Sequence, residues 1–211
     1  IAGLKSFQDG MYQIQDISSM LAGEYTAPKA GDTIVDVCGA PGGKSINAAL
    51  KMSEQGDCGR VIARDLSDYK VALIDENIKR LNITNIQTQV YDALDCDESL
   101  INKADIVIAD LPCSGLGIIG RKPDIKYNAS PEKLQSLVDL QRDILKVVSR
   151  YAKRGGVLMY STCTINRAEN EDNADWICKE SGFTKDGEYH QLLPANSSGM
   201  DGFFVARLIK N

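Results

Sequence analysis

Two cysteines follow apolar runs of the sequence, and each stands in a short polar motif. Cys113 lies in Asp-Leu-Pro-Cys-Ser-Gly at 110–115, and Cys163 lies in Ser-Thr-Cys-Thr at 161–164. A thiolate is a strong nucleophile where nearby positive charge or a helix end lowers its pKa, and Asp110 adds a carboxylate suited to acid–base work. Buried cysteines usually serve only as small hydrophobic side chains. Two thiols and a carboxylate at strand ends favour covalent chemistry over that simpler role.

The other four cysteines lack this context. The six cysteines include no C-x-x-C pair, and they are too sparse for the disulfide framework of a secreted protein or for a structural zinc site. We therefore expect reduced thiols, a cytoplasmic location and no bound metal. Packing is the expected role of Cys58, Cys96 and Cys178, whereas Cys38 stands in a glycine-rich loop.

This glycine-rich loop, at 36–45, follows the first apolar run and leads into a predicted helix. A phosphate-binding P-loop would need a glycine at the position of Cys38. The Gly-x-Gly-x-x-Gly pattern at 115–120 also fails as a dinucleotide motif, because Arg-Lys-Pro follows it instead of a helix. What remains is an acidic strand end, Asp36, before a glycine turn at a helix N-terminus. This pattern suits a ligand with a carboxylate and an ammonium group, such as S-adenosylmethionine, and a turn without a ligand is the alternative.

Two further carboxylates stand at the ends of the next two predicted strands. Asp65 could accept hydrogen bonds from both hydroxyls of a ribose, and Asp92 could contact an adenine amino group. Either residue alone is more often a helix cap than a ligand contact. Together with Asp36, they place acids at three successive strand ends, which favours a nucleoside site.

These residues need a scaffold that brings strand ends together. Strands are predicted at 34–37, 60–63, 85–90, 104–109, 157–160, 183–185 and 203–209. Helices are predicted from about 43 and at 67–81, 130–153 and 167–180. Apolar strands that alternate with helices predict an α/β fold with a mostly parallel sheet covered on both faces. Ligands of such sheets bind at the carboxyl ends of the strands, where the motifs above lie.

Length and composition restrict the classes of protein further. The 211 residues are 43% apolar and 25% charged, which predicts one globular domain over 1–211, with a helical addition over about the first 30 residues. No stretch reaches the roughly 20 apolar residues of a membrane span, so we expect no membrane contact. The net charge of -5 argues against a protein that holds nucleic acid through phosphate contacts alone. The chain begins with Ile1 instead of Met, which suggests a piece of a longer protein; we expect a monomer.

Three motifs together resemble those of the RNA cytosine-5 methyltransferases. They are Asp-x-Cys-x-Ala-Pro-Gly-Gly-Lys at 36–44, Asp-x-Pro-Cys-Ser-Gly-x-Gly at 110–117 with Arg-x-Pro-Asp at 121–124, and Ser-Thr-Cys-Thr at 161–164 with Glu-Asn-Glu at 169–171. Within that family, the segments at 123–127 and 201–208 are similar to the Sun-type group, which methylates small-subunit ribosomal RNA. The resemblance covers essentially the whole chain.

The resemblance implies a Rossmann-like methyltransferase fold with a C-terminal antiparallel strand pair. It also implies transfer of a methyl group from S-adenosylmethionine to carbon 5 of a cytosine in RNA, through a covalent bond to carbon 6. Cys163 would be the nucleophile, Cys113 would help release the product, and Asp110 would hydrogen-bond the base. Lys126 would support the site electrostatically, with a solvated surface lysine as its alternative. DNA cytosine-5 methyltransferases would use Cys113 as the nucleophile instead.

The resemblance further implies a cofactor site and an RNA partner. The cofactor-binding residues would be Cys38, Gly39, Ala40, Pro41, Gly42, Gly43, Lys44, Asp65, Asp92 and Asp110. The expected substrate is 16S rRNA with an unpaired or opened cytosine, because a paired base must leave its stack to react. Members of the group carry an upstream helical RNA-binding domain, which would explain an acidic chain with a nucleic-acid substrate. The alternative function is an inactive S-adenosylmethionine-binding module for ribosome assembly.

Overall fold

The computed structural model of the chain describes residues 1–56, 59–194 and 200–211, so Cys58 lies outside the described residues. The described strands are β1 (Thr33–Asp36), β2 (Arg60–Asp65), β3 (Ile86–Val90), β4 (Ala104–Asp110), β5 (Ala152–Thr162), β6 (Phe183–Lys185), β7 (His190–Leu192) and β8 (Phe203–Lys210). The described α-helices are α1 (Lys5–Gln8), α2 (Ile17–Thr26), α3 (Gly43–Glu54), α4 (Asp68–Arg80), α5 (Ile125–Asn128), α6 (Pro131–Val148) and α7 (Glu171–Ser181).

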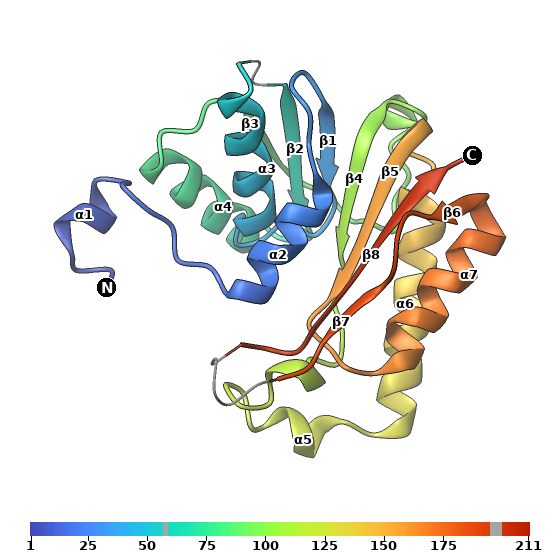
Figure 1. Ribbon diagram of the computed structural model, residues 1–211. Helices are drawn as coiled ribbons and strands as arrows, with labels where there is room; N and C mark the ends of the chain where they lie inside the picture. The colour runs from blue at the N-terminus through green and yellow to red at the C-terminus, as the bar shows by residue number, and fades with distance from the viewer. Residues whose placement is uncertain (57–58, 195–199) are drawn as a thin grey trace.

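The strands form one sheet in the order β3-β2-β1-β4-β5-β8-β6, with β7 also paired to β8 (Figure 1). Strands β1 to β5 are parallel to one another, and β8 runs antiparallel to β5, β6 and β7. The chain leaves β1 in one direction toward β2 and β3, and returns on the other side of β1 as β4. The connections that follow β1 and β4 therefore lead away in opposite directions. α/β sheets bind their ligands at the carboxyl ends of two such strands.

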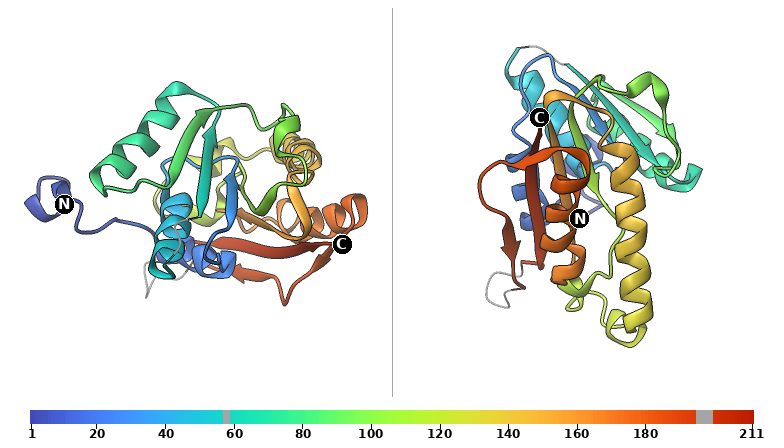
Figure 2. Two further views of the ribbon diagram at one scale, coloured as in Figure 1. Left: turned by 90° about the horizontal axis from the view of Figure 1, so that it is seen from above. Right: turned by 90° about the vertical axis from the view of Figure 1, so that its right-hand side faces the viewer.

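Both faces of the sheet are buried, and alternate residues of each strand point to opposite faces. On one face, Ile34 and Ile108 pack with residues of α2, α3 and α4, such as Ile46. On the other face, Val35 and its neighbours pack against α6 and α7, which lie side by side (Figure 2). The predicted mostly parallel sheet with helices on both faces and a C-terminal antiparallel pair is confirmed.

Local sequence signals explain where several helices begin and end. The side chains of Asp16, Ser67 and Ser130 accept hydrogen bonds from the first-turn amides of α2, α4 and α6. Pro131 opens α6, where its missing N–H costs no intrahelical hydrogen bond. Helix α7 ends at Gly182, which adopts a left-handed conformation with φ 68°.

The end of α6 was predicted wrongly. We expected this helix to continue to position 153 and the next strand to begin at Val157, but α6 ends at Val148 and β5 begins at Ala152. Tyr151 is 1% exposed, and its carbonyl accepts hydrogen bonds from the amides of Lys103 and Ala104. Burial of this tyrosine beside β4 requires the chain to leave the helix early, against the helical pattern of the sequence.

Two other segments also differ from expectation. The helix predicted at 167–180 is split into a short 3-10 helix, Arg167–Glu169, and α7. Strand β7 was not predicted, and it shares the outer edge of β8 with β6. In the described part of the chain, no helix is long and apolar enough to cross a membrane.

Candidate active site

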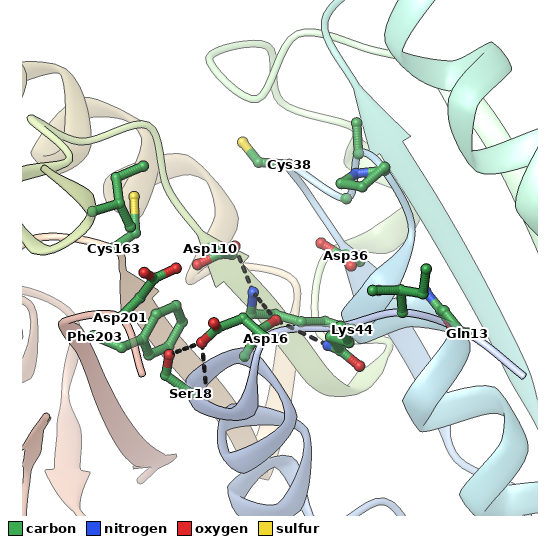
Figure 3. A pocket seen from close by; sticks show the side chains of 18 residues that line it. Gln13, Asp16, Ser18, Asp36, Cys38, Lys44, Asp110, Cys163, Asp201 and Phe203 are labelled. Carbon is green, nitrogen blue, oxygen red and sulfur yellow. Dashed lines mark hydrogen bonds and ion pairs between the residues drawn. The ribbon is translucent and has the colours of Figure 1, made fainter. Parts of the chain in front are cut away.

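A cavity of about 300 Å³ opens at the carboxyl ends of β1, β4 and β5 (Figure 3). Seven of the ten predicted cofactor residues line it: Asp110 and, from the glycine-rich loop, Cys38, Gly39, Ala40, Pro41, Gly43 and Lys44. Asp36, Asp110 and Cys163 line the same cavity. The motifs at 36–44, 110–117 and 161–164 are thus brought together in space, as the parallel-sheet prediction requires.

The loop between β1 and α3 is held by its neighbours in the sheet. The amide of Gly39 donates to the carbonyl of Arg64 over 2.7 Å, and the amide of Ala40 donates to Asp65 Oδ2 over 3.0 Å. Gly42 stands at the N-cap of α3 with φ 105°, a conformation that favours glycine. The N-terminal end of α3 therefore faces the cavity, where it can stabilise a negatively charged group.

Asp36 lies at the bottom of this loop and is 1% exposed. Its Oδ2 accepts a hydrogen bond from Ser45 Oγ over 2.6 Å, and its Oδ1 is a buried atom without a hydrogen-bond partner among the described residues. Burial raises the pKa of Asp36 to about 7. A carboxylate with an unsatisfied oxygen beside a cavity fits a ligand that brings a positively charged amine.

Three predicted cofactor residues are absent from the described lining of the cavity: Gly42, Asp65 and Asp92. Asp65 is 3% exposed, and besides the Ala40 amide it accepts the Leu66 amide and pairs with Lys70 over 2.9 Å. Asp92 Oδ1 accepts the amide of Leu94 over 2.9 Å. Both carboxylates stand at strand ends as predicted, and their roles toward a nucleoside remain predictions.

Asp110 is held by two partners at the end of β4. Lys44 Nζ lies 2.6 Å from its Oδ2, and Ser161 Oγ donates to its Oδ1 over 2.7 Å. The Lys44 side chain is only 9% exposed, so this ion pair is largely desolvated. The sequence analysis assigned Lys44 to the cofactor loop. It did not predict that the Lys44 ammonium reaches Asp110, in the motif at the end of β4.

Lys126, by contrast, is exposed on α5, and its ammonium lies 4.8 Å from the ring centre of Tyr127. It is not among the described residues that line the cavity. In the structure, Lys44 brings a positive charge to Asp110 and lowers the pKa of Cys163. The electrostatic role of Lys126 remains an untested prediction.

The two thiols meet at the edge of the cavity. Cys113 Sγ and Cys163 Sγ are 3.2 Å apart; Cys163 lines the main cavity, and Cys113 lines a neighbouring one of about 180 Å³. Their hydrogen bond lowers the pKa of the Cys163 thiol and raises that of the Cys113 thiol, with burial adding to the rise at Cys113. Lys44 also lowers the pKa of Cys163. Of the two thiols, Cys163 is therefore the one that ionises more readily.

Close backbone packing fixes the Cys163 segment. The amide of Gly117 donates to the Cys163 carbonyl over 3.1 Å, and the amide of Gly202 donates to the Gly117 carbonyl over 2.8 Å. A Cβ at Gly117 would lie 2.7 Å from the Cys163 carbonyl oxygen and 2.3 Å from that of Gly202. The second glycine of the 115–120 pattern is therefore needed for this close approach, and not for a dinucleotide.

The N-terminal segment also contributes to the cavity, which sequence analysis missed. Gln13, Gln15 and Asp16 line one side of it, ahead of α2 (Figure 3). Asp16 forms an ion pair with Arg121, which also pairs with Asp201 over 3.0 Å. Residues from the beginning, middle and end of the chain thus close around the same site. For this region, the sequence analysis predicted only a helical addition over about the first 30 residues.

Comparisons with known proteins agree with this arrangement. The model of a family described as 16S rRNA methyltransferase RsmB/F matches residues 24–209. A probable ribosomal RNA small subunit methyltransferase B of Bacillus subtilis (strain 168) is 38% identical, with 100% of this chain and 50% of that protein covered. Ribosomal RNA small subunit methyltransferase B of Salmonella paratyphi B is 34% identical, with 100% and 49% covered.

A solved structure shows the same fold. NSun6 from Pyrococcus horikoshii, determined with SFG, has a TM-score of 0.87 and 29% sequence identity, over 100% of this chain and 56% of that one. The chain spans about half the length of the curated relatives it matches. Because the family model runs from α2 to the end of β8 and includes all three motifs, the chain belongs to the 16S rRNA methyltransferase RsmB/F family.

Proposed function

We propose that residues 1–211 form the catalytic domain of an RNA methyltransferase that acts on carbon 5 of a cytosine in small-subunit ribosomal RNA. The observation that carries the proposal is the pair of thiols 3.2 Å apart at the edge of a cavity that also holds Asp110 and Lys44. The names of the relatives, which are ribosomal RNA small subunit methyltransferases, support the class of substrate. The donor proposed is S-adenosylmethionine.

The β1–α3 loop suits the amino-acid end of this donor. Asp36 offers an unsatisfied carboxylate oxygen for the ammonium group, and the N-terminus of α3 offers backbone N–H groups for the carboxylate. S-adenosylmethionine, when bound, supplies a methyl group on a positively charged sulfur. Asp65 and Asp92 are proposed to contact its ribose and its adenine.

The first step we propose is addition of the Cys163 thiolate to carbon 6 of the cytosine. Carbon 5 is too weak a nucleophile to accept a methyl group unaided, and addition at carbon 6 converts the ring into an enamine whose carbon 5 can attack. The ring nitrogen N3 takes up a proton in this step. Asp110, held by Lys44 and Ser161, is positioned to relay that proton from water to N3 and to hydrogen-bond the N3/N4 edge.

Release of the methylated product reverses the addition. The proton on carbon 5 leaves to water, and its electron pair restores the double bond between carbons 5 and 6. The bond between carbon 6 and sulfur breaks with its electron pair on Cys163, and N3 returns its proton to Asp110. Cys113 assists because its S–H group, with its sulfur 3.2 Å from that of Cys163, can donate a hydrogen bond to the departing thiolate.

Covalent trapping on RNA that contains 5-fluorocytosine tests the substrate class and the nucleophile together, because fluorine at carbon 5 blocks the release step. We expect the parent protein to form a complex with small-subunit ribosomal RNA that survives denaturing gels in the presence of S-adenosylmethionine. Cys163→Ala should form none. Cys178→Ala, which removes a half-buried thiol on α7, should trap like the parent. Absence of trapping by the folded parent would favour the inactive assembly module.

A further inference from the structure

The Glu-Asn-Glu motif at 169–171 has no role in the steps above, although Glu169 is a carboxylate with 0% exposure. It accepts four hydrogen bonds, all from neutral donors. Its Oε2 accepts from the Ser114 amide over 2.9 Å and from Gln141 Nε2 over 3.1 Å. Its Oε1 accepts from Ser114 Oγ over 2.6 Å and from Asn166 Nδ2 over 2.9 Å. Burial of a charge costs free energy unless hydrogen-bond donors compensate it, so the Glu169 carboxylate depends on these four hydrogen bonds.

The network holds the chain on both sides of Cys113. Glu169 binds the amide and the hydroxyl of Ser114, the residue that follows this cysteine. Gln141, on α6 and also 0% exposed, donates to the carbonyl of Pro112, the residue that precedes it, over 2.9 Å. One buried cluster therefore fixes the backbone of the segment that carries the Cys113 thiol.

The same cluster reaches the segment that carries Cys163. Ser114 Oγ lies 2.8 Å from Thr164 Oγ1. Asn170, 0% exposed, accepts from Thr162 Oγ1 over 2.6 Å and donates to the Thr164 carbonyl over 3.1 Å. Glu169 and Asn170 thus connect the two segments that carry the thiols.

We propose that Glu169 is a positioning residue for product release: it holds the Cys113 segment so that this thiol reaches the Cys163 sulfur when the bond to carbon 6 breaks. This role rests on the proposed function. Loosening the Cys113 segment weakens the hydrogen bond that lowers the pKa of Cys163, but the Lys44 charge that also lowers it remains. Addition therefore keeps one of its two supports, whereas release depends on the donor aimed at the departing sulfur. Loosening the Cys113 segment should therefore slow release more than addition.

The test uses Glu169→Gln, which keeps the side-chain shape but replaces one acceptor oxygen with an NH₂ group. With ordinary small-subunit ribosomal RNA and S-adenosylmethionine, we expect turnover to fall by about 10- to 100-fold, as expected when a buried hydrogen bond of 1–3 kcal/mol is lost. A covalent protein–RNA complex should accumulate at the same time. Trapping on 5-fluorocytosine RNA, which reports addition and methyl transfer without release, should stay close to that of the parent. The matched control is Glu180→Gln, the same change at an exposed position of α7.

Ser114→Ala provides a second variant in case Glu169→Gln does not fold. It removes the hydroxyl donor and leaves the hydrogen bond from the Ser114 backbone amide to Glu169. We therefore expect the covalent protein–RNA complex to accumulate to a smaller extent. Equal losses of trapping and turnover in a folded variant that binds the cofactor normally would reduce Glu169 to a general structural role. Normal turnover in both variants would also overturn the proposal. Failure of the parent and of Glu180→Gln to trap RNA would instead count against the proposed function itself.

Discussion

At the scale of single residues, the two thiols differ because their neighbours differ. Cys163 has a hydrogen-bond donor in Cys113 and a cation in Lys44 nearby, and both lower its pKa. The hydrogen bond to Cys163 and partial burial raise the pKa of Cys113. A thiolate at Cys163 beside a thiol at Cys113 matches the order of events that we propose, in which one sulfur attacks and the other assists its departure.

The titration of Asp36 leads to a prediction for cofactor binding. With a pKa of about 7 in the free protein, Asp36 is largely protonated at pH 6, and a bound ammonium group favours its ionised form. Binding below pH 7 must therefore release a proton, so affinity for S-adenosylmethionine should rise by up to about tenfold from pH 6 to pH 7 and then level off. Asp36→Asn should bind weakly with little pH dependence in this range. Titration calorimetry at several pH values measures both effects.

The control for that experiment is Asp172→Asn, which removes an exposed carboxylate of α7 and should leave the pH profile unchanged. A parent affinity that falls between pH 6 and pH 7 would show that Asp36 does not meet the ammonium group. The range stops below pH 7.5 because a free α-amino group itself titrates near 7.7–8.0.

The sequence predicted the site residues that stand in a motif at the end of a strand, such as Asp36, Asp110 and Cys163. It was not predictable where a long side chain crosses from one motif to another. Lys44 stands in the cofactor loop of the sequence, yet its flexible side chain places the charge 2.6 Å from Asp110. Glu169 was noticed only as part of a family motif, because three of its four hydrogen bonds come from Ser114 and Gln141, which are far away in the sequence.

At the scale of secondary structure elements, the N-terminus of α3 leaves little room for a side chain in the proposed cofactor site. Gly43 opens this helix and lines the cavity, and a Cβ there would lie 3.1 Å from Gln15 Nε2. Any larger side chain must displace the N-terminal segment or fill the space in which the ligand carboxylate would approach the helix.

Gly43→Val should therefore weaken S-adenosylmethionine binding by about a hundredfold or more, which corresponds to about 2.8 kcal/mol. The matched control is Gly120→Val, because a Cβ at Gly120 meets nothing within 4 Å. Thermal unfolding should show that both variants are folded, and calorimetry should show the loss only at Gly43. Unchanged affinity in folded Gly43→Val would remove this loop from the cofactor site.

The elements themselves were largely predictable because their strands are short, apolar and separated by clear turns. The failures came where tertiary contacts outweigh local pattern. The sequence of α6 remains helical in pattern beyond Val148, but burial of Tyr151 against β4 ends the helix there. Strand β7 is only three residues long, and its pairing with β8 leaves no periodic signal in the sequence.

At the scale of the whole molecule, charge limits how residues 1–211 can bind RNA. The net charge is -5, and the exposed Lys122 and Lys126 follow the Cys113 motif on the loop and on α5. We propose that an additional RNA-binding part of the natural protein supplies most of the affinity. The relatives are about twice as long as this chain, which leaves room for such a part.

Residues 1–211 alone should accordingly bind small-subunit ribosomal RNA only weakly, with a Kd of about 10⁻⁶ to 10⁻⁴ M at physiological salt. Affinity should fall steeply as salt rises, because phosphate contacts release counterions. Fluorescence anisotropy across a salt series measures this dependence. Nanomolar binding by this chain at physiological salt would contradict the proposal of a separate RNA-binding part.

The most direct test of the central claim is the chemical identity of a covalent intermediate. Cys113→Ala should carry out addition and methyl transfer but release product slowly, so it should accumulate a protein–RNA complex with ordinary RNA and S-adenosylmethionine. Mass spectrometry of the digested complex should find a cytosine nucleotide, one methyl group heavier than normal, bonded to the Cys163 sulfur. A bond to any other residue, an unmethylated nucleotide, or full turnover by Cys163→Ala would contradict the account.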